Sequence, residues 1–185
     1  MRRRDLLLLI GGAVAAPASA ARAQQQRRIG FLSSVSADRI EDQLVALRHG
    51  LNETGYAEGR NLLIEYRWAE GRYDRLPALA AELVRENVEV IVTSGGPQPP
   101  AAAMQATAVI PIVASSAGSL VKHFNRPEGN LTGVSILTGT LVPKRLEMLT
   151  ELVSRVAVGV LMNPTYSEYD RDHREIESAA RVLGV

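Results

Sequence analysis

From residue 28 onward, apolar residues recur in two alternating patterns. Short apolar runs of the kind found in buried strands occupy five stretches, residues 28–33, 62–68, 88–93, 110–114 and 131–136. The first two segments between them carry apolar residues at three- and four-residue spacing, which predicts amphipathic helices. Strands that alternate with helices predict a parallel sheet covered by helices on both faces. We therefore expect residues 27–136 to form one doubly wound α/β layer.

Four helices are expected between these strands. The first spans residues 40–51 and stops at Gly55. The second begins at Asp74, a suitable N-cap residue. Alanine-rich residues 99–107 predict a third helix, and the apolar residues within 120–124 suggest a short fourth.

The same alternation starts again in the last part of the chain. The pattern predicts a helix, a strand and another helix, at residues 143–153, 156–162 and 168–183. Gly184 stands where a helix C-cap belongs. These three elements are too few to close a sheet. We expect residues 24–138 to be a first α/β lobe and residues 139–185 to be the truncated beginning of a second.

The first 23 residues have the features of a secretion signal. Arginines at positions 2–4 precede an apolar stretch at residues 6–16, which is too short to span a bilayer. Ala21 and Ala23 are small residues at the positions that a signal peptidase reads, so we predict cleavage before Gln24. The run RRDLL also resembles the twin-arginine export signature. The alternative is an uncleaved N-terminal anchor.

Charge and cysteine content narrow the function classes. Removing residues 1–23 takes away four arginines and one aspartate, so the net charge falls from +1 to −2. The mature chain has no cluster of basic residues, and we expect no nucleic-acid partner. The absence of cysteine excludes disulfides and cysteine-ligated metals.

Small polar residues follow four of the predicted strands. They are Ser33 and Ser34, Ser94, Gly95 and Gly96, Ser115 and Ser116, and Asn163. Open α/β sheets bind ligands at the C-terminal ends of their strands, so we expect these residues to form a site for a small polar solute. N–H groups at the start of the helix that follows can hold a carboxylate. The alternative is that they are ordinary turn residues, because serine, glycine and asparagine dominate turns.

The sequence carries no recognisable catalytic motif. It contains no G-x-G-x-x-G, no phosphate-binding loop and no G-x-S-x-G. His49, His123 and His173 stand far apart among charged neighbours and are expected on the surface. We assign no catalytic residue, no metal ligand and no cofactor, and we expect a protein that is not an enzyme.

Short segments in a fixed order carry a resemblance to a known family. They are the N-terminal signal and residues 28–32 (RIGFL), 50–56, 58–61 (EGRN), 65–69 (EYRWA), 79–84 (LAAELV), 110–113 (IPIV), 126–133 (RPEGNLTG), 144–147 (KRLE) and 156–164. The chain resembles the N-terminal part of ABC transporter substrate-binding proteins, in the group that includes tryptophan- and tyrosine-type periplasmic solute-binding proteins.

This resemblance implies a type I periplasmic-binding fold, in which two α/β lobes joined by a hinge close around a solute. It implies that the cleft is lined by Ser33, Ser34, Ser94, Gly95, Ser115, Ser116 and, from the second lobe, Asn163. It also implies a periplasmic location, a small solute such as an amino acid or another small carboxylate, and the membrane permease of an ABC transporter as partner. A sensory ligand-binding domain and an α/β hydrolase or isomerase remain as alternatives, but the export signal and the missing catalytic motifs favour solute binding.

Overall fold

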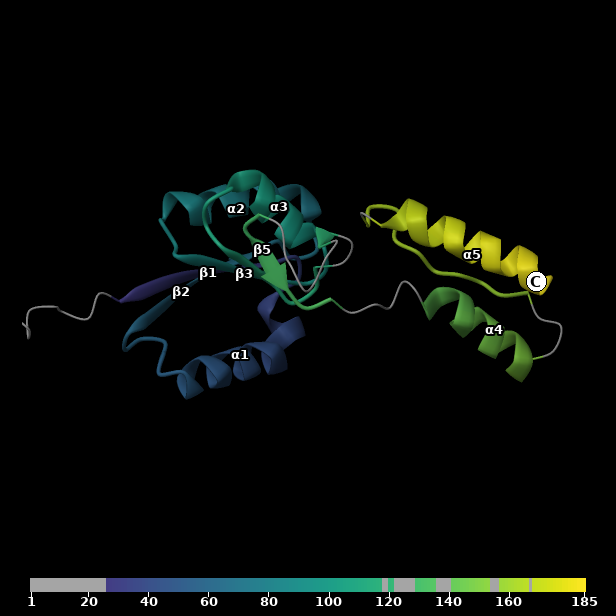
Figure 1. The fold of residues 1–185 in the computed structure, drawn as a ribbon, viewed down its shortest axis with the longest axis horizontal. Coiled ribbons are helices and arrows are strands. Elements are labelled where there is room, and N and C mark those ends of the chain that lie inside the picture. The colour runs from purple at the N-terminus through teal and green to yellow at the C-terminus, as the bar shows by residue number, and fades with distance from the viewer. Residues whose placement is uncertain (1–25, 118–119, 122–128, 136–140, 154–156, 167) are drawn as a thin grey trace, which may run out of the picture.

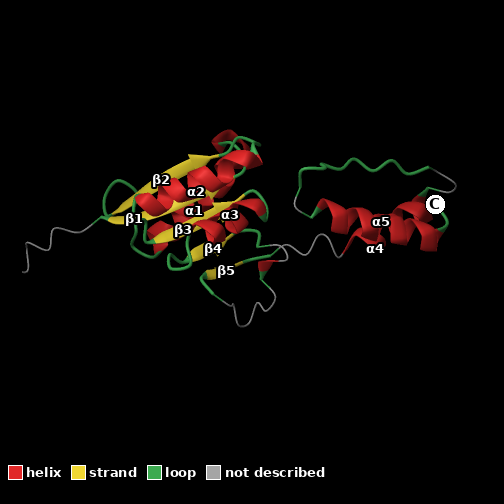
Figure 2. Ribbon diagram, turned by 90° about the horizontal axis from the view of Figure 1, so that it is seen from above, coloured by secondary structure: helices red, strands yellow, loops and turns green. Residues whose placement is uncertain are grey.

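The first part of the chain forms a five-stranded parallel sheet (Figures 1 and 2). This computed structural model describes residues 26–117, 120–121, 129–135, 141–153, 157–166 and 168–185. The strands are β1 (Arg27–Ser33), β2 (Leu62–Trp68), β3 (Val90–Ser94), β4 (Ile112–Ala114) and β5 (Leu131–Gly133). The proposed signal at residues 1–23 lies outside the described residues.

The strand order is β2-β1-β3-β4-β5, and every neighbouring pair is parallel. Ile29 pairs with Ile64 of β2 on one side and with Val90 of β3 on the other. In the sheet, β2 therefore lies on one side of β1, and the next strand along the chain, β3, lies on the other side. This reversal makes the β1/β3 boundary the topological switch point, where ligands bind in sheets of this order.

Helices cover both faces of the sheet, as the alternating pattern predicts (Figure 1). Helix α1 (Glu41–Glu53), preceded by the short 3-10 helix η1 (Ala37–Ile40), lies on one face. Helices α2 (Leu76–Arg85) and α3 (Gln98–Ala106) lie on the other. The doubly wound α/β layer is thus confirmed.

Alternate residues of β1 serve the two faces. Phe31 packs with Ile40 and Leu44 in the cluster under α1. Leu32 packs with Leu76 and Leu83 in the larger cluster under α2 and α3. Each face therefore has a core of its own, and β1 is the strand on which both are built.

Some expected boundaries differ from the observed ones. Asp74 does not cap a helix, because it lies inside a 3-10 turn, η2 (Tyr73–Arg75), and α2 has Arg75 at its N-cap without a side-chain hydrogen bond. Pro77 falls in the first turn of α2, where its missing N–H costs nothing. Strand β4 is shorter than expected and begins after Pro111. Most of the helix expected around residues 120–124 lies outside the described residues.

The last part of the chain contains α4 (Val142–Leu152) and α5 (Tyr169–Leu183), which lie side by side in both views (Figures 1 and 2). We refer to residues 141–185 as the α4–α5 segment. Gly184 ends α5 in the left-handed conformation, with φ 69°, as its position predicts. Among the described residues, none of the helices combines the length and the apolar composition that a membrane span requires.

The prediction of a strand at residues 156–162 is wrong. Residues 157–162 have no strand structure, and residue 156 lies outside the described residues. A parallel strand needs a hydrogen-bonding neighbour, and no described strand pairs with this stretch. Its Leu161 is accordingly fully exposed. In α4 only Leu146 is buried, whereas Leu149 of this helix and Val153, which follows it, remain exposed.

Candidate functional site

The switch point brings several of the predicted site residues together. Ser33, at the end of β1, stands opposite Ser94, at the end of β3. Ser34 continues this pairing, since its N–H donates to the Ser94 carbonyl at 3.3 Å and its hydroxyl donates to the Gly95 carbonyl at 2.6 Å. All three serines are buried. The predicted strand-end cluster therefore exists at this edge of the sheet.

Hydroxyl groups in this cluster hold the backbone in place. The Ser33 hydroxyl accepts from the Val35 N–H at 3.2 Å, and the Ser94 hydroxyl donates to the Gln43 amide oxygen at 3.1 Å. Gly95 has φ +91°, and a Cβ added there would lie only 2.3 Å from the Ser34 hydroxyl oxygen. The two strand ends can approach this closely because residue 95 is glycine.

The start of α3 offers few donors to an anion. Of its first four backbone nitrogens, those of Pro99 and Pro100 carry no hydrogen, and that of Ala101 donates to the Pro97 carbonyl at 3.2 Å. Only the Gln98 N–H is left among these four. Gly96 precedes this turn with φ +110°. The start of α3, which we expected to hold a carboxylate with several N–H groups, therefore offers little more than the Gln98 N–H.

The remaining predicted residues have different surroundings. Ser115 follows β4, where its N–H donates to the Thr93 carbonyl at 3.0 Å, and its side chain is exposed. Ser116, next to it, is half-buried. Asn163 is exposed in the α4–α5 segment, and its side-chain oxygen accepts from the Thr165 N–H and hydroxyl at 3.0 and 2.9 Å. Its side chain thus closes a turn ahead of α5.

A pocket of about 540 Å³ opens at the switch point. It is lined by Val35, Ser36, Arg39, Ile40, Gln43, Glu70, Gly71, Ser94 and Gly95. We call it the switch-point pocket. Only Ser94 and Gly95 of its lining were predicted from the sequence. Glu70 and Gly71 follow the end of β2. The sequence-based prediction did not include residues at this strand end.

Charged groups of both signs surround this pocket. Arg39 lines it from η1, beside Asp38. The pKa of the Asp38 carboxyl is lowered, chiefly by a hydrogen bond from the Ser36 side chain. The positive charge of Arg39 lowers this pKa further. Glu70 lines the pocket from the turn after β2 and forms an ion pair with Arg75 at 3.0 Å. The site can therefore meet both an anionic and a cationic group of a ligand.

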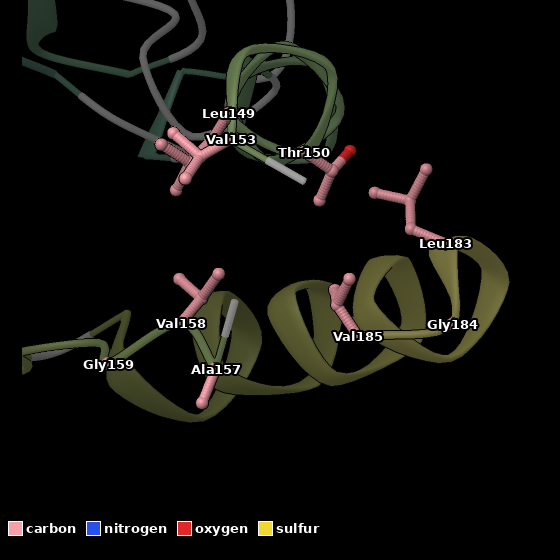
Figure 3. Close-up of a pocket in the computed structure, with 9 residues that line it drawn as sticks. All are labelled: Leu149, Thr150, Val153, Ala157, Val158, Gly159, Leu183, Gly184 and Val185. Atoms are coloured by element: carbon pink, nitrogen blue, oxygen red, sulfur yellow. The ribbon is translucent and has the colours of Figure 1, made fainter. Parts of the chain in front are cut away.

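A second pocket, of about 600 Å³, lies in the α4–α5 segment (Figure 3). Leu149 and Val153 face Val158 across it, with Leu183 and Val185 toward its other end. Among the described residues that line this pocket, Thr150 has the only polar side chain. This lining is suited to packing against apolar groups and has little capacity to orient a polar solute. Within the described residues, no three His, Asp or Glu side chains gather closely enough to hold a metal ion.

Comparisons with known proteins agree with this architecture. A family model described as ABC transporter substrate binding protein matches residues 28–185. The chain is 25% identical over 143 residues to the tyrosine-binding protein of Clostridioides difficile strain R20291, covering 74% of this chain and 41% of that protein. It therefore spans less than half the length of that relative.

Two solved structures are similar over most of the chain. A conserved domain protein from Vibrio cholerae has 28% sequence identity and a TM-score of 0.74. The ABC domain in complex with L-Trp from Streptococcus pneumoniae has 22% identity and a TM-score of 0.71. Each match covers 86% of this chain and 55% of the other. These similarities confirm the predicted type I periplasmic-binding-protein fold. With the family model matching most of its length, the chain belongs to the family of ABC transporter substrate-binding proteins.

Proposed function

We propose that this chain is the periplasmic solute-binding component of an ABC-type importer, and that its first lobe provides one wall of the binding cleft. The observation that carries the proposal is the switch-point pocket, an open, polar hollow at the position where sheets of this strand order bind ligands. In this proposal the second lobe, including Asn163, supplies the opposite wall. Closure of the lobes then presents the solute to a membrane permease.

The lining of the pocket supports binding without turnover. It offers a hydroxyl from Ser94, the Gln43 amide and the charged groups of Arg39 and Glu70. Among the described residues that line it, none is a histidine that could activate a serine as a nucleophile. These groups can orient a small solute through hydrogen bonds and charge. Export through the N-terminal signal, with cleavage before Gln24, is part of the same proposal.

The test is a solution NMR titration of the chain with a panel of amino acids, small carboxylates and sugars at millimolar concentration, where weak binding is still visible. We expect at least one solute to shift the amide signals of residues 34–36, 70–71 and 94–96. Trp68 provides a second signal, because the only tryptophan of the chain ends β2, two residues before Glu70. Shifts confined to the α4–α5 segment, or no shifts with any solute, would contradict the proposal.

A further inference from the structure

A further pocket, of about 350 Å³, lies at the end of the sheet opposite the switch point. It opens between the second half of α1 and the start of β2, where Leu62 pairs with Arg27, the first residue of β1. We call it the α1–β2 pocket. Its volume falls within the range of small-molecule sites, which begins near about 300 Å³. Of the described residues that line it, none also lines the switch-point pocket.

The lining of the α1–β2 pocket combines an apolar floor with a polar rim. The floor includes Leu62 and Ile64, two buried residues of β2. The rim includes Arg48 and Asn52 from α1 and Tyr56 and Glu58 from the loop that follows. A small molecule with an apolar body and one polar group fits such a lining.

Hydrogen bonds hold the loop between α1 and β2 in one shape. The Asn61 side chain ties it at two points, because its oxygen accepts from the Ala57 N–H at 2.8 Å and its amide donates to the Gly55 carbonyl at 2.9 Å. The Ala57 carbonyl accepts from the Leu62 N–H at 3.2 Å, and the Gly59 N–H donates to the Leu62 carbonyl at 2.9 Å. This wall of the pocket is therefore set before a ligand arrives, which lowers the entropic cost of binding.

Three hydrogen bonds fix the guanidinium of Arg48 at the rim. Its Nε donates to the Glu58 carboxylate at 2.8 Å, and its Nη2 donates to the Tyr66 hydroxyl at 2.9 Å. The Tyr66 hydroxyl donates in turn to the same Glu58 oxygen, Oε2, at 3.3 Å. Burial, and then the Glu58 carboxylate, raise the pKa of Tyr66, so this hydroxyl keeps its proton. The set is closed and holds Arg48 and Glu58 side by side.

The rim keeps donors and an acceptor for a ligand. Among the hydrogen bonds of the described residues, none uses Nη1 of Arg48, Oε1 of Glu58 or the side-chain amide of Asn52. A primary amide can accept from Arg48 and Asn52 and donate to Glu58. A carboxylate would meet Arg48 and the like charge of Glu58 together, because these two form an ion pair. The rim therefore favours an uncharged amide over an anion.

We propose that the α1–β2 pocket is a ligand site separate from the switch-point pocket, and that it binds an uncharged ring compound that carries an amide group. The ring packs on Leu62 and Ile64 beside Tyr56. The amide oxygen accepts from Arg48 and Asn52, and the amide nitrogen donates to Glu58. This inference does not rest on the proposed function, because the two pockets lie at opposite ends of the sheet.

The test uses benzamide as the probe in an NMR titration of the chain at millimolar concentrations. We expect saturable shifts of the amide signals of residues 51–59, 62 and 64, with a Kd of about 1–10 mM for so small a molecule. Acetamide lacks the ring and benzoate carries a charge in place of the amide, so each should bind at least about fivefold more weakly. The inference is overturned if no saturable shifts occur at these residues, or if either analogue binds as well as benzamide. Shifts at the switch-point pocket alone would also overturn it.

Three variants test the roles of the rim residues. Asn52→Leu should weaken benzamide binding about fivefold, because it removes one donor. His49→Leu is the matched control, since His49 is an exposed residue of the same helix outside the lining, and binding should not change. Glu58→Gln removes the like charge, so the affinity for benzoate relative to benzamide should rise about tenfold. Equal losses in Asn52→Leu and His49→Leu, or an unchanged benzoate-to-benzamide ratio in Glu58→Gln, would overturn the assignment.

Discussion

At the scale of single residues, the switch point depends on a few atoms that lie very close together. The Ser34 hydroxyl donates a hydrogen bond to the Gly95 carbonyl, and the same hydroxyl oxygen occupies the space that a Cβ at residue 95 would need. Serine at a strand end therefore has a structural task here as well as a place near the pocket. Such close packing explains why small residues gather at this edge of the sheet.

Gly95→Ala should destabilise the chain. The left-handed conformation alone costs about 1–2 kcal/mol for an alanine, and the contact with Ser34 adds to that cost. Gly50→Ala is the matched control, because Gly50 lies within α1 and a methyl group added there points into open space. It should stabilise the chain by about 0.5–1 kcal/mol. Urea denaturation measures both free energies of unfolding, and changes of the same sign in the two variants would contradict this account.

A tyrosine in the α4–α5 segment predicts a pH dependence. Burial, and then the nearby Glu168 carboxylate, raise the pKa of Tyr166 to about 12. An ordinary phenol has a pKa near 10, so the folded state favours the neutral form of Tyr166. The stability that this group contributes is therefore complete below about pH 10 and is lost as the pH rises toward 12.

Absorbance of tyrosinate during an alkaline titration measures this directly. Tyr166→Phe should remove the component that ionises near pH 12 and leave the earlier components in place. In concentrated urea, the wild type and the variant should both show tyrosine ionisation near pH 10 only. If the tyrosine that Tyr166→Phe removes from the folded protein ionises near pH 10, the raised pKa of Tyr166 is refuted.

At the scale of elements, ion pairs connect the edge strand β2 to helix α2. Arg67, on β2, is 19% exposed and forms ion pairs with Glu82 of α2 and with Glu86, the C-cap residue of that helix. The Glu82 pair measures 2.9 Å. One guanidinium thus joins the edge strand to the last turn and the C-cap of the covering helix, a geometry that its planar set of donors allows.

Arg67→Met should lower the free energy of unfolding by about 1–3 kcal/mol, because it leaves the Glu82 and Glu86 carboxylates without their cation. Arg67→Lys should fall between wild type and Arg67→Met, since an ammonium cannot bridge both carboxylates in the same way. Arg27→Met is the control, because the Arg27–Glu89 pair is much more exposed, and its loss should change stability little. The account fails if Arg27→Met costs as much as Arg67→Met in urea denaturation.

The elements differ in how far the sequence alone could predict them. Strand β2 was predicted at its observed bounds, because its apolar residues are buried by neighbours that the same pattern supplies. The strand expected at 156–162 was wrong, because an apolar run becomes a strand only where another strand pairs with it. Arg39 and Gln43 were missed for a similar reason. A charged side chain on a 3-10 helix and an amide side chain in the first turn of α1 look like ordinary surface residues in the sequence, and only the fold brings them to the end of β3.

At the scale of the whole molecule, the two parts of the chain differ in how much apolar surface they bury. Residues 26–135 contain two buried clusters, one on each face of the sheet. In the α4–α5 segment, only Leu146 and Ala179 are buried among the described residues, whereas Leu152, Leu161 and Val182 are strongly exposed. Because buried apolar area supplies most of the stabilisation, the two parts should differ in local stability.

Hydrogen exchange of the intact chain tests this difference. Amides of β1 and β3, at the centre of the sheet, should exchange only through global unfolding, whereas amides of α4 and α5 should exchange at least about a hundredfold faster through local opening. The variant Gly95→Ala, which weakens the sheet, should speed exchange in β1 and β3 and leave α4 and α5 unchanged. The same variant leaves the apolar surface of the α4–α5 segment intact, so it serves as an internal control. Equal protection of the sheet and the two helices would mean that the whole chain unfolds as one unit, contrary to what the distribution of buried residues predicts.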